Sequence, residues 1–196
     1  MRIIAGNFRG RRLLAPQGQA IRPTGERARE ALFDILEHGT PSLRGARFLD
    51  LFCGTGAIGL EAHSRGAAEV LLVEHDRAGL KVAQANIARL GSPASVRLLA
   101  RDAGRLGPAP HPFDLIFLDP PYRSGLAGAT LEALSRGGWL AADARIIAEL
   151  GATEDLDLPA GYTLERERRY GSAKFLFLHH SSRATPSTGT TTRPDA

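Results

Sequence analysis

The sequence has a single cysteine, only two lysines and no long apolar run, and each scarcity excludes a class of protein. Cys53 alone forms neither an internal disulfide nor a multi-cysteine metal site, and the six histidines show no metal-ligand spacing. No apolar run approaches the roughly 20 residues that a membrane helix requires. The N-terminus lacks the long apolar segment of a signal peptide. We therefore expect a cytoplasmic protein without a bound metal.

Because lysine is so scarce, nearly all of the 25 basic residues are arginine, and the net charge is +4. The planar guanidinium group pairs bidentately with phosphate and stacks on bases. Residues 1–29 contain seven arginines against one acid, Glu26. Such a local excess is typical of a nucleic-acid contact. Genome composition is the alternative explanation, since Ala and Gly are abundant as well.

The chain divides into an arm, a domain and a tail. Residues 1–22 alternate loosely between apolar and polar positions and contain several glycines, so they are predicted to form a basic β-hairpin arm. Residues 181–196 are predicted to form a disordered tail. A helix is expected between an N-cap at Thr24 and a stop at Gly39. Its apolar stripe consists of Ala28, Ala31, Leu32, Ile35 and Leu36. This helix opens the main domain, residues 23–180.

Apolar strands alternate with helices through the rest of the domain. We expect buried strands at 47–52, 69–74, 95–100, 113–118 and 144–150, and helices at 57–66, 77–90 and 126–136. This alternation predicts a parallel sheet covered on both faces. Residues 162–170 and 173–180 alternate around a turn at Gly171 and predict an antiparallel hairpin. The predicted fold is α/β and Rossmann-like, with a mostly parallel seven-stranded sheet.

A glycine-rich loop joins the first strand to the next helix. Gly54, Gly56 and Gly59 spell G-x-G-x-x-G, and Glu74 ends the following strand 20 residues after Gly54. This spacing is typical of an adenosine-containing cofactor whose ribose binds the acid. Asp50 would repel a pyrophosphate but suits a cationic ammonium group, so it favours S-adenosylmethionine over NAD. The alternatives are an Asx-turn for Asp50 and a solvated strand end for Glu74.

Two other residues near this loop allow more than one role. Asp102 follows the third strand, where its carboxylate either accepts from the adenine amino group or caps a turn at residues 103–106. Cys53 is a conceivable nucleophile for methylating a pyrimidine carbon. We reject that role, because a cysteine flanked by Phe52 and Gly54 in a cofactor loop behaves as a small hydrophobe.

The fourth strand ends in Asp119-Pro120-Pro121-Tyr122. In this fold it lies beside the first strand, where the strand order reverses and ligands bind. The Asp119 carboxylate and the Pro120 carbonyl offer two acceptors for the two N–H groups of an exocyclic amine. They would stabilise the positive charge that grows on nitrogen during methyl transfer, while the Tyr122 ring stacks on the base. The alternative is a simple strand terminator with a surface tyrosine.

Several segments together resemble the RsmD family of bacterial 16S rRNA guanine-N2 methyltransferases. They include "IRPTGERAREALFDIL", "FLDLFCGTGAIGLEA", "FDLIFLDPPYRSG" and "RRYGSAKFLFL", and the resemblance covers about residues 2–178. It implies a class I methyltransferase fold, S-adenosylmethionine as cofactor, and a target guanine in the 16S rRNA of the small ribosomal subunit, or of its assembly intermediate. We expect the protein to act as a monomer.

The resemblance also implies the site residues. Catalysis would fall to Asp119, Pro120, Pro121 and Tyr122, and cofactor binding to Thr24, Arg29, Asp50, Gly54, Gly56, Glu74 and Asp102. A structural role in fixing the helix to the sheet is the alternative for Thr24 and Arg29. RNA contacts are predicted at Arg9, Arg11, Arg12, Arg22 and Arg123.

Three rival functions use parts of the same pattern. A DNA adenine-N6 methyltransferase shares the amine chemistry, but base flipping requires a recognition surface for which this chain has no long insertion. A dehydrogenase shares the glycine loop but needs a substrate domain, and only a hairpin and a tail follow Glu149. A non-catalytic RNA-binding module would not need Asp119 and Tyr122.

Overall fold

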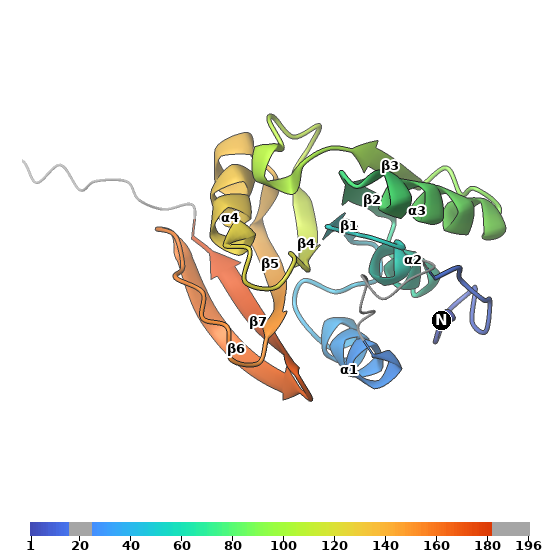
Figure 1. The fold of residues 1–196 in the computed structure, drawn as a ribbon, viewed down its shortest axis with the longest axis horizontal. Coiled ribbons are helices and arrows are strands. Elements are labelled where there is room, and N and C mark those ends of the chain that lie inside the picture. Colours follow the sequence, from blue (N-terminus) through green and yellow to red (C-terminus); the bar gives the residue numbers. More distant parts are fainter. Residues whose placement is uncertain (16–24, 182–196) are drawn as a thin grey trace, which may run out of the picture.

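A computed structural model describes residues 1–15 and 25–181. Its centre is a seven-stranded sheet with the order β3-β2-β1-β4-β5-β7-β6 (Figure 1). The first five strands are parallel, and β7 runs antiparallel to both β5 and β6. Their bounds are β1 Arg47–Leu51, β2 Glu69–Glu74, β3 Val96–Ala100, β4 Phe113–Leu118, β5 Leu140–Gly151, β6 Tyr162–Tyr170 and β7 Ala173–His180. The predicted α/β fold with a C-terminal antiparallel hairpin is confirmed.

Helices cover both faces of the sheet. They are α1 Glu26–Glu37, α2 Ala57–Ser64, α3 Arg77–Arg89, α4 Leu126–Gly137 and the short 3-10 helix η1 Ala103–Arg105. Side chains from α1, α2 and α3 share one apolar cluster with the sheet, and side chains from α4 and η1 share the other. The central strands contribute side chains to both clusters, which explains why they are apolar at nearly every position.

The main boundary difference lies in β5. It begins at Leu140, four residues before the expected start, and its pairing with β4 shifts register between Phe113 and Leu115. The first residues, "LAAD", include exposed positions and so lack the apolar signature of a buried strand. Backbone pairing with β4 therefore extends β5 beyond the apolar residues from which its start was predicted.

Helix α1 differs from the sequence predictions in its N-cap and in its buried face. It has Gly25 at its N-cap, not Thr24, and it ends at Glu37 with His38 at the C-cap. Its buried residues are Ala28, Arg29, Leu32, Phe33 and Leu36, whereas Ala31 and Ile35 are only partly buried. The buried face is rotated because the Arg65 guanidinium lies over the Phe33 ring at 5.0 Å and Arg29 reaches the N-terminal arm.

The N-terminal arm folds back on itself within residues 1–15, the described part of the segment for which a β-hairpin was predicted. Arg2 and Arg12 form an antiparallel bridge, and Ile3 N donates to the Arg11 carbonyl at 3.0 Å. The buried carboxylate of Glu61 on α2 accepts from Ile4 N at 2.7 Å and Ala5 N at 2.9 Å. A buried side chain thus satisfies the free backbone edge of the hairpin and fixes the arm on α2.

Some predictions fall on residues outside the described ranges. These are the roles given to Thr24 and Arg22, residues 16–22 of the arm and nearly all of the C-terminal tail. Among the helices of the described residues, none has the length and apolar character to cross a membrane.

Candidate active site

Asp50, Glu74 and Asp119 lie at the ends of β1, β2 and β4, at the edge of the sheet where the parallel strands end. Strands β1 and β4 are neighbours, and Asp119 N donates to the Leu51 carbonyl at 3.4 Å just beyond their paired residues. This bond places the Asp119–Tyr122 turn beside the glycine loop, where Figure 1 shows the ends of β1 and β4 side by side. The strand order reverses here, which is where α/β proteins bind ligands.

The glycine loop requires backbone conformations that favour glycine. Gly54 has φ of 52° and Gly56 has φ of 75°, and a Cβ at Gly56 would lie 3.0 Å from a methyl carbon of Leu72. Phe52 also has positive φ, 59°, which is rare outside glycine and asparagine. Such strain tends to occur at functional sites. The loop leads into α2, whose N-terminus faces the same edge.

Asp50 is buried beneath the loop. It is 1% exposed, and its Oδ2 accepts from Gly59 N, in the first turn of α2, at 2.8 Å. The contact spans nine residues, so the Asx-turn interpretation is wrong. Burial, followed by the nearby Glu74 carboxylate, raises the pKa of Asp50 to about 7 despite that hydrogen bond. A cation bound above the loop would stabilise the ionised form.

Glu74 crosses from β2 to the glycine loop. Its Oε2 accepts from Gly54 N at 2.8 Å, and its Oε1 accepts from His75 N and Asp76 N at 2.8 Å each. It is 6% exposed, which excludes the solvated strand end. Three backbone donors hold the carboxylate in one orientation at the loop, where a ribose hydroxyl pair is expected.

Two neighbouring residues have defined structural contacts. Asp102 is the N-cap of η1 and accepts from Gly104 N at 2.9 Å, so it makes the capping contact that the sequence allowed. Its adenine contact stays a prediction. Burial raises the pKa of the Cys53 thiol well above its usual value, and the Asp50 and Glu74 carboxylates raise it further. Cys53 therefore stays protonated, which agrees with its rejection as a nucleophile.

The Asp119–Tyr122 turn is held by backbone and side-chain contacts. Pro120 is buried, whereas Tyr122 is 42% exposed. Arg123, with φ of 56°, donates its N–H to Glu154 Oε1 at 3.0 Å, and Gly151 N donates to Glu154 Oε2 at 3.4 Å. Glu154 thereby ties the turn to the end of β5.

A second acid accompanies Asp119. Burial raises the pKa of Asp119 well above its usual value, and the charges of Glu149 and then Asp50 raise it further. Glu149 is 3% exposed on β5. The edge is therefore acidic, and carboxylates concentrated in a buried place favour a cationic ligand.

Comparison with known proteins agrees with this geometry. The family model described as conserved hypothetical protein 95 matches residues 1–179. The chain belongs to this family. It is 38% identical to Ribosomal RNA small subunit methyltransferase D of Escherichia coli strain K12, over 89% of this chain and 87% of that protein. It is 32% identical to Putative rRNA methyltransferase YlbH of Bacillus subtilis strain 168, over 87% and 94%.

A solved structure gives the same result. A putative methyltransferase, yhhF, from Escherichia coli superposes with a TM-score of 0.80 and 37% sequence identity, covering 93% of this chain and 99% of that chain. The resemblance to the RsmD family is thereby confirmed. This member of the conserved hypothetical protein 95 family is a methyltransferase with the class I fold.

The predicted arginines of this family member lie in two different environments. Arg9, Arg11, Arg12 and Arg123 are exposed, although Arg11 also donates to the Arg89 carbonyl at 3.2 Å. Arg29 is 1% exposed, and its Nη2 donates to the Arg2 carbonyl at 2.6 Å. Its observed contact joins α1 to the arm, not to the sheet as the structural alternative had it, and its cofactor role stays a prediction.

The sequence analysis missed three residues of the site. Glu149 interrupts the apolar run from Ile146 to Leu150, which was the available signal. Asn86 is buried on α3; its Nδ2 donates to the Thr55 carbonyl at 2.9 Å and its Oδ1 accepts from Leu14 N at 2.7 Å. It links the arm to the glycine loop. Glu154 lies in a loop without a recognisable pattern, so only its contacts reveal it.

Proposed function

We propose that this chain transfers a methyl group from S-adenosylmethionine to the exocyclic N2 amine of one guanine in 16S rRNA. The observation that supports this most directly is the position of the Asp119–Tyr122 turn beside the acidic glycine loop, joined at Leu51. Relatives that share most of the chain are named for methylation of the small-subunit rRNA.

The cofactor side of the site fits S-adenosylmethionine in charge and shape. The positive-φ glycines Gly54 and Gly56 leave two loop positions without side chains, and a Cβ at Gly56 would already touch Leu72. Glu74 presents an acceptor for the ribose hydroxyls, and Asp50 supplies negative charge beneath the loop. When bound, the cofactor supplies an electrophilic methyl group on a cationic sulfur.

The substrate side provides acceptors for the amine. An aryl amine is a poor nucleophile, because its lone pair is delocalised into the ring. The Asp119 carboxylate and the Pro120 carbonyl accept from the two N–H groups, which holds nitrogen close to sp³ geometry and directs its lone pair toward the methyl carbon. Both acceptors stabilise the positive charge that develops on nitrogen. Asp119 takes the released proton.

The arm and the turn contribute basic residues for the RNA. Arg9, Arg11 and Arg12 project from a hairpin that is fixed to α2 and α3, and Arg123 follows Tyr122 directly. The guanidinium groups of the arm, and that of Arg123 beside the turn, would bind phosphates, and Tyr122 would stack on the target base for about 1–3 kcal/mol. We propose that the substrate is the small subunit or its assembly intermediate, and that the protein acts as a monomer.

The test is methyl transfer from labelled S-adenosylmethionine to small ribosomal subunits that lack their native methylations, followed by nucleoside analysis. We expect label in N2-methylguanosine with the wild type. Asp119→Ala should abolish transfer, whereas Asp143→Ala, an exposed aspartate near the opposite end of β5, should retain it.

Two outcomes would contradict the proposal. Label in a different nucleoside would disprove the N2 target. Cofactor binding without transfer to any ribosomal RNA would remove the proposed substrate, and duplex DNA would then be the next substrate to test for adenine-N6 transfer.

A further inference from the structure

Strand β6 forms one edge of the sheet, and its exposed charges are unevenly paired. Its sequence between Leu164 and Tyr170 is Glu-Arg-Glu-Arg-Arg. Both acids form ion pairs with arginine or lysine, at N–O distances between 2.7 and 3.9 Å: Glu165 with Arg145, and Glu167 with Arg169 and Lys174. His179 Nε2 also lies 3.1 Å from Glu165 Oε2. The acids therefore contribute little free negative charge to this edge.

Two arginines of β6 have no acidic partner among the described residues. Arg166 and Arg168 are both exposed, and Arg168 donates only to the backbone carbonyl of Glu167, at 3.1 Å. Exposed guanidinium groups without a carboxylate retain their full capacity to bind an anion.

The strand register places both arginines on the same side. Arg166 lies opposite Phe177 and Arg168 opposite Phe175, and both phenylalanines belong to the apolar cluster that includes α1. Arg169 lies opposite Lys174 and so faces the other side of the sheet. The unpaired cations are thus turned toward α1, and the paired one toward α4.

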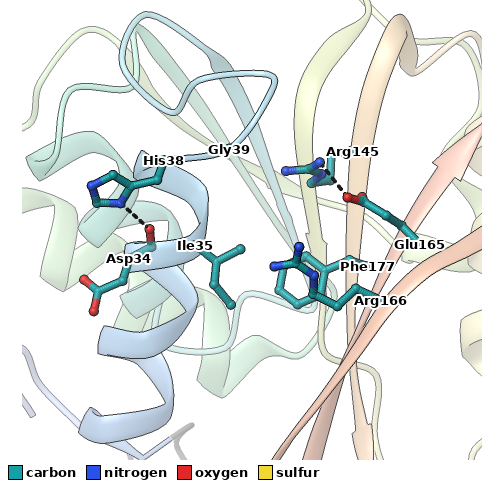
Figure 2. Close-up of a pocket in the computed structure, with 8 residues that line it drawn as sticks. All are labelled: Asp34, Ile35, His38, Gly39, Arg145, Glu165, Arg166 and Phe177. Carbon is teal, nitrogen blue, oxygen red and sulfur yellow. Dashed lines mark hydrogen bonds and ion pairs between the residues drawn. The ribbon is translucent and has the colours of Figure 1, made fainter.

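An open pocket of about 400 Å³ separates Arg166 from α1. Figure 2 shows Arg145, Arg166 and Phe177 on the sheet side, with Asp34 and His38 on the helix side. On the sheet side the ring of Phe177 lies beside Arg166, its partner across the strands, but it is only 1% exposed, so the accessible groups there are the polar ones. Asp34 on the helix side repels phosphate, so an anionic chain in this pocket would lie against β6.

The row formed by Arg166 and Arg168 leads along β6 toward the proposed methylation site. At about 3.3 Å per residue, β6 rises roughly 13 Å from Arg166 to Tyr170. Its turn is joined to the loop after β5, because Ala152 N donates to the Ser172 carbonyl at 2.9 Å. Gly151, at the end of β5, is in contact range of Tyr122, whose ring lies 4.0 Å from a Cβ built there.

We propose that the α1-facing side of β6 binds the backbone of the RNA strand next to the target nucleotide, with phosphates on Arg166 and Arg168. This inference rests on the proposed function. RNA is the occupant that the geometry favours, because the row ends where the target base must sit and the backbone continues from that base. Sequence-specific RNA recognition targets unpaired segments. A single RNA strand of this kind fits along one side of a single β-strand such as β6.

The experiment compares two charge-matched double variants. Arg166→Gln/Arg168→Gln removes the two unpaired cations, and Arg136→Gln/Arg169→Gln removes two exposed, ion-paired arginines on the α4 side. Binding to protein-free 16S rRNA and to undermethylated small subunits is measured between 50 and 200 mM salt. Cofactor affinity and the thermal midpoint are measured for each variant to verify the folded site.

We expect the salt slope of RNA binding to fall by about 1.4 in the Arg166/Arg168 variant, since each phosphate contact with single-stranded nucleic acid contributes about 0.7. Its KM for RNA should rise while kcat at saturating RNA and the affinity for the cofactor stay unchanged. The control variant should keep the wild-type slope.

Other results distinguish a failure of the β6 contact from a failure of the proposed function. Equal slopes in the two double variants, with normal methylation by the wild type, would refute the β6 contact and leave the proposed function intact. Weaker binding to assembled subunits with unchanged binding to protein-free RNA would also overturn it, because the partner would then be a ribosomal protein. Absence of rRNA methylation by the wild type would instead overturn the proposed function.

Discussion

Two glycines in the N-terminal arm allow its docking to be tested with a built-in control. Gly6 has φ of 79°, and a Cβ there would lie 1.9 Å from the carbonyl oxygen of Ser64 on α2. Gly10 has nearly the same φ, 81°, but no atom lies within 4 Å of its Cβ position. Gly6→Ala and Gly10→Ala therefore share the backbone strain, and only Gly6→Ala disturbs the contact with α2.

The magnitudes follow from the contacts. An L-residue in the left-handed region costs about 1–2 kcal/mol, which applies to both variants. The overlap at Gly6 is with backbone atoms, so relief requires the arm to move away from Ser64. Three hydrogen bonds hold the arm there: Asn7 N to Ser64 O at 2.8 Å, Phe8 N to Ser64 Oγ at 2.9 Å, and Ser64 Oγ to Ala5 O at 2.5 Å. At about 0.5–1.5 kcal/mol each, their loss adds roughly 1.5–4.5 kcal/mol.

Urea unfolding followed by circular dichroism measures the difference. We expect Gly6→Ala to lose about 2.5–6.5 kcal/mol of the free energy of unfolding and Gly10→Ala about 1–2 kcal/mol. Trypsin should cleave the arm of Gly6→Ala earlier, after Arg9, Arg11 or Arg12. Equal losses and equal cleavage rates in the two variants would refute the docked arm.

Three further predictions concern the acidic edge. Because the Glu149 charge helps raise the pKa of Asp119, Glu149→Gln should move the acidic limb of the kcat/KM profile to lower pH, and an unchanged limb would contradict that coupling. The pKa of Asp50 is raised to about 7 in the folded chain, so the folded state retains a proton that the unfolded state loses above about pH 4. Asp50 should therefore reduce stability as pH rises from about 4 to 7, by at most about 4 kcal/mol, and urea midpoints of Asp50→Asn should depend less steeply on pH than those of the wild type. Glu154→Ala should raise the KM for RNA, since it removes the acceptor of Arg123 N and Gly151 N and loosens the turn. Calorimetry should show an unchanged affinity for the cofactor. A loss of cofactor affinity would show that Glu154 does not act mainly through the turn.

The order of the elements was predictable because their signals are local. Apolar runs of strand length between glycine-stopped helices indicated the parallel sheet, and alternation around Gly171 indicated the hairpin. The buried face of α1 was predicted less well. Periodicity selected Ile35, whereas packing buries Arg29 and Phe33, because the contacts with Arg2 and Arg65 come from distant segments.

For the candidate site, the sequence identified the residues at the strand ends but not the contacts that orient them. Motif spacing indicated Asp50, Glu74 and Asp119, since parallel strands deliver their carboxyl ends to one edge. It did not reveal that Asp50 caps α2 across nine residues, or that Glu74 holds three backbone donors. Those partners depend on how the loop folds.

The sequence by itself determined the fold class, the glycine loop and the Asp119–Tyr122 turn, because each depends on the spacing of neighbouring residues. Only the tertiary structure decided which charges remain available. Arg166 and Arg168 differ from Arg169 by the side of β6 on which they lie and by the acids within reach. Arg29 is likewise turned inward by its helix. Charge pairing and burial are set by residues far apart in the chain, so composition alone does not distinguish a binding arginine from a structural one.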